Sequence, residues 1–134
     1  MAISLDKLTA FHHRAVRVRT DRMEVIAGNL ANQNTPGYKA RDINFKEAMS
    51  SARYQQSMHM ERTSDKHLSG RMVSNTEMGY RVPTQPDTGD GNTVEAQIER
   101  NQFLDNGLRY QASLQFLDGK LKGMKKAISG GQGG

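Results

Sequence analysis

The residues that could do acid–base or metal chemistry are scattered along this chain. His12 and His13 are adjacent, so on a helix they point about 100° apart and do not converge on one ion. His59 and His67 add no metal-ligand spacing, and no motif pairs two of the 14 carboxylates in a pocket. Phosphate-binding and nucleophile-elbow motifs are also missing. We therefore expect no catalytic residue, no metal site, no cofactor and no enzyme activity.

A run of amides is the most unusual polar feature. Residues 29–35 read Asn-Leu-Ala-Asn-Gln-Asn-Thr, and Pro-Gly-Tyr follows at 36–38. Proline and glycine explain why a helix stops here, but they do not explain Asn29, Asn32 and Asn34, since asparagine is a poor helix-interior residue. Amides donate and accept hydrogen bonds, so we expect contacts with neighbouring chains; the alternative is that they only end the helix.

Two long helices must position these residues. The first is predicted over 3–33, from apolar residues at alternating spacings of three and four that His12 and Arg19 interrupt. The second is predicted over 93–128, with Asn92 and Glu95 as a capping box. Its seam contains Ala96, Arg100, Phe103, Gly107, Tyr110, Leu114, Leu117, Leu121, Met124 and Ile128. Such seams are typical of coiled coils, so we expect the helices to pair antiparallel.

The apolar residues are concentrated at the two ends of the chain. Leu, Ile, Val and Phe together number 24 of 134 residues: 11 lie in residues 1–45, 10 in residues 93–134 and only three between. The middle of the chain is therefore too polar to supply a sizeable core of its own. The two ends must pack on each other, on other copies, or on both.

These patterns predict a mainly α fold, in which two long terminal helices pair as an antiparallel coiled coil around an irregular polar middle. We divide the chain into a helix at 1–35, a middle segment at 36–92, a helix at 93–128 and a flexible tail at 129–134. Within the middle, residues 42–45 alternate like a half-buried strand and residues 46–60 form a weak helix. Residues 61–92 are rich in turn residues, and we predict no element there.

The stretch from Met23 to Lys39, with its Ala-Gly-Asn-Leu-Ala-Asn-x-Asn-Thr-Pro-Gly-Tyr core, resembles the N-terminal signature of bacterial flagellar axial proteins, the rod and hook group. The short length and the ending Gly-Lys-Leu-x-Gly-Met-Lys-Lys-Ala-Ile at 119–128 are most similar to the proximal rod proteins of that group. We expect an assembly interface formed by Asn29, Leu30, Asn32, Asn34, Pro36, Gly37, Tyr38, Leu114, Leu117, Leu121, Met124 and Ile128.

The resemblance implies a structural subunit of the basal-body proximal rod. Such subunits stack helically with other axial proteins, transmit torque and line the export channel. Their implied partners are copies of the chain, other rod proteins, the rod–ring adaptor, the membrane ring and the export gate. The implied location is the periplasmic rod, reached by flagellar type III export without a cleaved signal peptide. No stretch approaches the roughly 20 apolar residues that span a bilayer, so no transmembrane segment is expected.

Two other classes of function remain open. The pI of about 9.7 and the cluster of Arg14, Arg17, Arg19 and Arg22 are compatible with a basic helical protein that binds nucleic acid. That reading leaves the amide run unexplained, and no array of aromatic residues for base stacking accompanies the arginines. A helix lying on a membrane surface is the third possibility, but arginines interrupt its apolar seam. We therefore expect neither nucleic acid nor a membrane as the partner.

Overall fold

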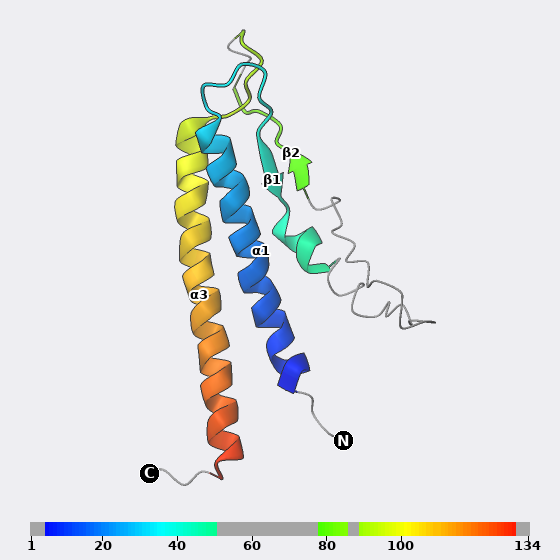
Figure 1. Ribbon diagram of the computed structural model, residues 1–134, viewed down its shortest axis with the longest axis vertical. Helices are drawn as coiled ribbons and strands as arrows, with labels where there is room; N and C mark the ends of the chain where they lie inside the picture. The colour runs from blue at the N-terminus through cyan, green and yellow to red at the C-terminus, as the bar shows by residue number, and fades with distance from the viewer. Residues whose placement is uncertain (1–4, 51–77, 86–88, 131–134) are drawn as a thin grey trace, which may run out of the picture.

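The computed structural model describes residues 5–50, 78–85 and 89–130 of the chain. Its helices and strands are, in order, α1 (Leu5–Ala31), β1 (Arg41–Ile43), β2 (Met78–Tyr80) and α3 (Ala96–Ile128). The two long helices lie side by side and run antiparallel, so the start of α1 and the end of α3 lie toward the same end of the molecule (Figure 1). This arrangement confirms a mainly helical fold whose terminal helices contact each other.

The end of α1 follows from its amides and the glycine after them. The Asn32 side chain donates to the Gly28 carbonyl oxygen at 2.8 Å and so bonds one of the carbonyls that the last helical turn leaves open. Gly37 then has a φ of 73°, a left-handed conformation that costs glycine least. The helix therefore ends at Ala31, two residues before the predicted end.

The start of α3 corrects one prediction. The helix begins at Ala96, and the Glu95 side chain at its N-cap makes no capping hydrogen bond. Instead, Glu95 Oε1 accepts from the Thr84 amide at 2.9 Å, and the Asn92 side chain bonds carbonyls beyond the end of α1. The predicted capping box of Asn92 and Glu95 is wrong because both side chains are taken by partners from other loops.

The middle of the chain contributes a two-stranded ribbon. β1 and β2 pair antiparallel, with Arg41 opposite Tyr80, Asp42 opposite Gly79 and Ile43 opposite Met78. The predicted strand at 42–45 is thus shifted, because Asn44 Oδ1 accepts from the amides of residues 46 and 47 and starts a helical turn over 45–50. The rest of the predicted helix at 46–60 lies outside the described residues. β2 was not predicted.

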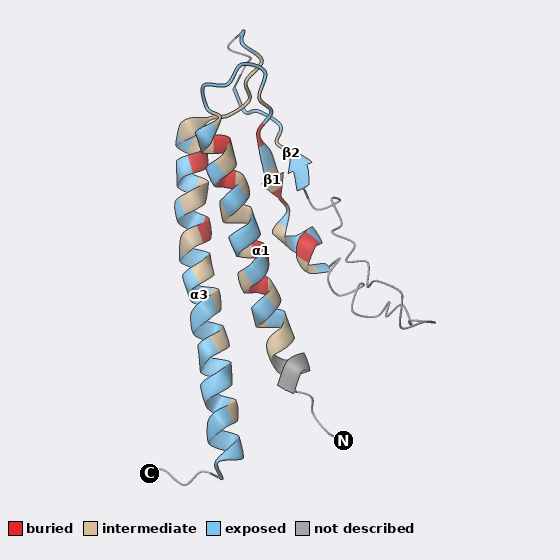
Figure 2. Ribbon diagram, in the orientation of Figure 1, coloured by how far each residue is buried: buried red, intermediate tan, exposed pale blue. Residues whose placement is uncertain are grey.

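The apolar core lies between α1 and the segment that follows β1, on the side of α1 turned away from α3. Figure 2 shows buried residues on both sides of this contact. Val18, Ile43 and Ala48 form the buried cluster. The half-buried side chains that pack around it are Val25, Phe45 and Met49. In Figure 1, α1 therefore lies between α3 and this apolar cluster.

The contact between the helices is less apolar than the predicted seam. Among its described residues, α3 buries only Glu99 and Asn106, and both are polar. Arg100, a predicted seam residue, is exposed, because the buried line runs one residue earlier at this level. Six other predicted seam residues are half-buried, namely Ala96, Phe103, Gly107, Tyr110, Leu117 and Met124. The sequence pattern therefore predicted the correct side of α3 for the contact along most of the helix. It was wrong in predicting that the residues buried there are apolar.

We predict that Ile26→Ala lowers the free energy of unfolding by about 2–5 kcal/mol, since Ile26 is fully buried and truncation leaves a cavity. Urea denaturation followed by circular dichroism measures this loss. Leu104→Ala is the matched control, because Leu104 is exposed on α3 and alanine is the better helix former; its effect should stay within about 0.5 kcal/mol. Equal losses in the two variants would contradict the described packing of α1.

Candidate functional site

The signature at the end of α1 is organised by one buried amide. Asn29 is fully buried, and its Nδ2 donates to the Arg41 carbonyl oxygen at 2.7 Å and to Glu99 Oε2 at 3.2 Å. Its Oδ1 accepts from the Arg41 amide at 3.0 Å and from the Tyr38 hydroxyl at 3.5 Å. The Asn29 amide group thus pairs with both backbone groups of Arg41, as a residue of a neighbouring strand would.

Arg81 connects the ribbon to α3 and to β1. Its Nη1 donates to Glu99 Oε1, and its Nη2 donates to Asp42 Oδ2 at 2.9 Å and to Gln102 Oε1 at 2.8 Å. The Arg81 side chain is only 17% exposed, so these bonds are partly shielded from solvent. One side chain therefore holds together three segments that are remote in sequence.

Arg22 completes the same network from α1. Its Nε and Nη2 donate to Oδ1 and Oδ2 of Asp42 at 2.8 and 2.9 Å, which is a bidentate pair. The same Nη2 also donates to Gln102 Oε1 at 3.0 Å. We call the group of Arg22, Asn29, Asp42, Arg81, Glu99 and Gln102 the polar junction. It contains two arginines and two carboxylates, so its charges can balance.

The pKa values of the two carboxylates of the polar junction shift in opposite directions, although burial raises both. Burial alone would raise the pKa of Asp42, but the hydrogen bonds and charge of Arg22, with a further bond from Arg81, bring that pKa below its ordinary value. Burial also raises the pKa of Glu99, and there the Asn29 hydrogen bond and the Arg81 charge offset the effect only in part. Asp42 is therefore the firmly ionised member of the pair.

A second polar contact lies lower between the helices. Asn106 is fully buried, and its Nδ2 donates to the Arg19 carbonyl oxygen at 2.9 Å. The Arg19 guanidinium stacks over the Phe45 ring at 4.2 Å and donates to Asn106 Oδ1 at 3.4 Å. Arg19, which interrupts the predicted apolar seam, is thus accommodated by an aromatic face and a buried amide.

The loop before α3 is bound to the signature by hydrogen bonds. Asn92 Nδ2 donates to the carbonyl oxygens of Asn32, Gln33 and Thr35 at 2.9–3.0 Å. The Gly37 amide donates to the Asp90 carbonyl oxygen at 2.9 Å, and Thr93 bonds backbone groups on both sides of Lys39. The turn after α1 therefore has a fixed shape.

The structure brings together only part of the predicted interface. Asn29, Asn32 and Tyr38 meet at the top of the helix pair, with Asn34 exposed beside them. The other predicted members from the signature are half-buried or exposed: Leu30, Pro36 and Gly37. The predicted residues of α3 form a separate group in its second half, and they are Leu114, Leu117, Leu121, Met124 and Ile128. The residues predicted to form one interface thus lie in two separate groups at different levels of the molecule.

Sequence reasoning missed most of the polar junction. Arg22, Asp42, Arg81, Glu99 and Gln102 come from four segments, and no spacing in the chain links them. The arginines beside the apolar seam of the first helix were the one available signal. Each of them needs either a buried partner or contact with solvent. Glu99 and Gln102 lie three residues apart on α3 and were the acceptors to consider.

The polar junction has the chemistry of a structural joint. Its donors and acceptors bond one another within the chain. In the described part of the chain, no three histidines or acidic residues are grouped to hold a metal. None of the described helices is long and apolar enough to cross a membrane. The arrangement can hold segments in place, and it offers no free nucleophile or base.

Comparison with known proteins agrees with this geometry. A family model for the flagella basal body rod protein matches residues 14–39, a range that includes the whole signature from Met23 to Lys39. The flagellar basal body rod protein FlgB of Aeromonas hydrophila is 49% identical over 98% of this chain and 100% of its own length. FlgB of Escherichia coli K12 is 43% identical over 95% and 99%, and FlgB of Salmonella typhimurium is 42% identical over 95% and 96%.

We predict that Asn29→Ala destabilises the free subunit by roughly 1–3 kcal/mol, because it leaves the Arg41 backbone and Glu99 without their buried partner. Asn34→Ala is the matched control, since Asn34 is exposed, and it should be nearly neutral. Urea unfolding of the two variants makes the comparison. A neutral Asn29→Ala would mean that the amide acts only as a helix stop.

The polar junction also predicts a pH dependence. Since burial raises the folded-state pKa of Glu99 above 4.5, its contribution is fully present below that pH and is lost as the pH rises through the folded-state value. Glu99→Gln cannot ionise, so wild type should lose stability relative to this variant between pH 4.5 and neutrality. Urea unfolding across this range measures the difference. A difference that is independent of pH would contradict the raised pKa.

Proposed function

The chain belongs to the FlgB family of flagellar basal body rod proteins, and we propose that it stacks helically with other axial proteins in the proximal rod. It is a structural subunit of the rod, not an enzyme, and it associates with rod components. In our proposal the stacked helices transmit torque and line the export channel. The rod–ring adaptor, the membrane ring and the export gate are the further neighbours that we propose.

The observation that carries this proposal is the apolar surface that one copy leaves uncovered. Leu114, Leu121 and Ile128 are 39, 50 and 73% exposed although they lie on the seam of α3. Figure 2 shows that most of the second half of α3 is exposed. A structural subunit that buries so little of its longest helix has apolar area left for its neighbours.

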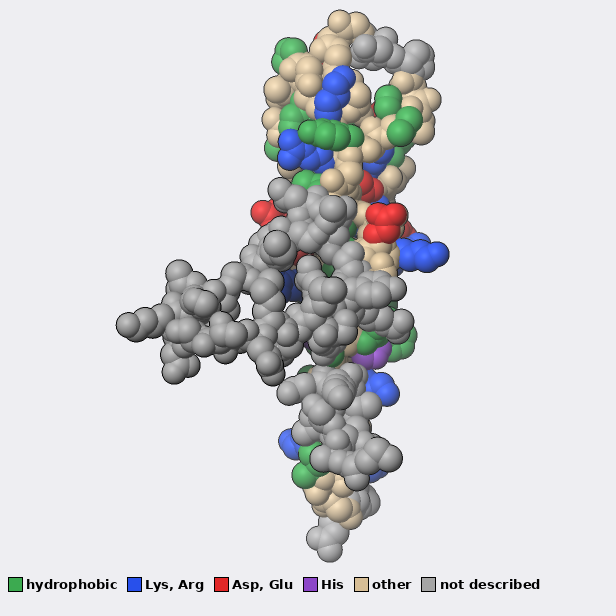
Figure 3. All heavy atoms as spheres, turned by 90° about the vertical axis from the view of Figure 1, so that its right-hand side faces the viewer, with side chains coloured by type: hydrophobic (Ala, Val, Ile, Leu, Met, Phe, Trp, Pro, Cys, Tyr) green, Lys and Arg blue, Asp and Glu red, His purple; other side chains and the backbone are tan. Residues whose placement is uncertain are grey.

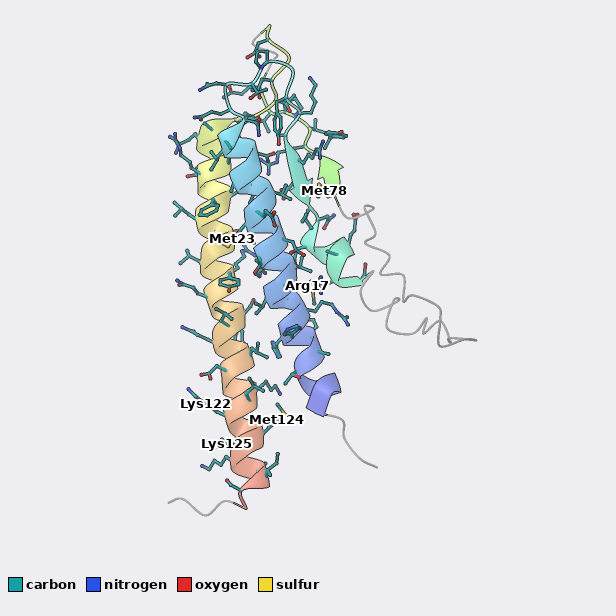
Figure 4. All side chains as sticks on the ribbon, viewed as in Figure 1. Arg17, Met23, Met78, Lys122, Met124 and Lys125 are labelled. Atoms are coloured by element: carbon teal, nitrogen blue, oxygen red, sulfur yellow. The ribbon has the colours of Figure 1, made fainter. Side chains whose placement is uncertain are left out.

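The exposure of Ile128, at the end of this seam, has a geometric reason. α3 has 33 residues and α1 has 27, and the His12 ring lies 6.2 Å from the Phe116 ring in the antiparallel pair. The last turn of α3 therefore runs past the start of α1. In Figure 4, Met124 lies on the side of α3 toward α1, and Lys122 and Lys125 point away from it. The seam thus continues, flanked by cations, where α1 no longer covers it.

Exposed apolar residues also occur on the opposite face of α3. Leu104 and Leu108 are about half a helical turn away from the buried Glu99 and Asn106. Two apolar faces on one subunit allow different surfaces to meet in neighbouring copies. Such a contact is heterologous and builds a helical assembly when it does not close.

The nucleic-acid hypothesis loses support from the same structure. Two of the four arginines on which it rests have partners within the chain, since Arg22 bonds Asp42 and Arg19 lies over Phe45. The high pI therefore overstates the positive charge that α1 can offer to phosphates.

We predict that Leu121→Asp blocks incorporation into rods while leaving the subunit folded. Leu121 is half exposed in one copy, so a charge there costs the free subunit little, but it cannot be buried against a neighbour without a large penalty. The measurement is recovery of the variant in basal bodies purified from a strain lacking the native gene, together with swimming.

Ala127→Asp is the control, because it adds the same charge to an exposed position on the flank of α3, away from both the seam and the opposite apolar face. It should be incorporated like wild type. If Leu121→Asp restores swimming and appears in basal bodies at the wild-type level, the seam of α3 is not an assembly surface.

A further inference from the structure

Among the described residues, the backbone groups on the outer edge of β2 have no partners. In the antiparallel register, Arg41 faces Tyr80, and the Arg41 amide and carbonyl both bond Asn29 on the far side of β1. Arg41 and Tyr80 are therefore a non-hydrogen-bonded pair, and so are Ile43 and Met78 two residues along. The amide and carbonyl groups of Met78 and Tyr80 consequently point away from β1.

The side chains beside this edge are apolar and exposed. Met78, Tyr80 and Val82 alternate along the chain and are 42, 69 and 83% exposed, whereas Arg81 between them turns inward to the polar junction. This is the reverse of the usual pattern, in which the solvent face of a strand is polar. Figure 3, which views the molecule from the ribbon side, shows hydrophobic side chains among cationic ones on the upper part of this face.

A cavity continues this surface beyond the end of β2. It has a volume of about 750 Å³ and lies between residues 80–85 and the start of α3. Its apolar lining includes Val82, Pro83, Val94 and Ile98. An extended segment that paired with β2 could therefore place a side chain in this cavity.

We propose that the outer edge of β2 binds an extended segment from a neighbouring axial subunit of another kind, which adds to the ribbon as a third strand. The inference rests on the proposed function, because it takes the neighbour from the rod. Free amide and carbonyl groups along an edge specify a strand as the occupant. The exposed row specifies apolar residues at alternate positions of that strand. Arg41, exposed and stacked on Tyr80 at 5.6 Å, favours a neutral or acidic strand.

A second copy of this chain does not fit this role. In the described part of the chain, the other strand, β1, is covered by β2 on one edge and by the Asn29 amide on the other. β2 is then the only described strand with which a second copy could pair. A β2–β2 contact is two-fold symmetric, so it joins two copies and leaves no free edge for a third. A closed pair cannot extend a rod, so the described strands of a second copy do not supply this segment, and we assign it to another axial subunit.

Tyr80→Pro tests the proposal because it removes only the outward amide. The ladder with β1 uses the neighbouring residues, so proline is tolerated at this edge position. Tyr80→Ala is the matched control, since it removes the same ring but keeps the amide. Gly79→Pro is the control for loss of the hydrogen bonds between β1 and β2, because the Gly79 amide points toward β1. Basal bodies from a strain lacking the native gene are compared for each variant, with urea unfolding of the purified subunits.

We expect Tyr80→Pro and Tyr80→Ala to unfold at the same urea concentration, while the proline variant is incorporated at least about fivefold less, as one lost hydrogen bond would produce. Hydrogen exchange gives a second measurement on wild type: the Met78 and Tyr80 amides should exchange freely in the subunit and be protected in basal bodies.

Equal incorporation of the two variants, or unprotected β2 amides in basal bodies, would overturn this inference alone. A wild-type dimer in solution that Tyr80→Pro converts to a monomer would overturn it in favour of β2–β2 pairing. If wild type itself were absent from basal bodies, the proposed function would fall, and this inference with it.

Discussion

The structure depends on satisfying one buried amide, the buried carboxylate of Glu99 and the half-buried carboxylate of Asp42 where four segments meet. Asn29 cannot be removed from water unless its donors and acceptor are bonded, and Arg41, Tyr38 and Glu99 supply these bonds. Glu99 in turn requires a cation, which Arg81 supplies from beyond the middle segment. Each bond fixes one segment relative to another, so the joint forms as a whole or leaves polar groups unpaired.

This joint explains why the upper half of the molecule differs from the lower half. Above, α1 is held by hydrogen bonds to β1 and α3, and an apolar cluster around Val18 supports the ribbon. Below, α3 continues with half-buried and exposed apolar residues up to Ile128. The upper half can therefore be ordered by the single chain, whereas the lower half has apolar surface available for other subunits. A rod subunit needs both properties, because it must keep a shape and also bind its neighbours.

The asparagines of the signature have bonds within the subunit that the interface prediction did not include. We expected their amides to contact neighbouring chains, but Asn29 and Asn32 have partners within the subunit. Asn92 binds the turn that follows from the other side. Their effect on assembly is then indirect, since they set the shape of the surface that a neighbour meets. Asn34, which is exposed, is the asparagine of the run left to face other subunits.

The sequence by itself determined the two long helices, their antiparallel contact and the end of α1, because helical periodicity and the Pro-Gly turn act over a few residues. It also indicated the family through the signature. It did not reveal β2, the polar junction or the start of α3. Those features depend on partners far apart in the chain, such as Arg81 with Glu99 or Asn92 with Thr35. Only the tertiary structure decided them, because a buried charge or amide is stable at a position only when the fold brings its partner there.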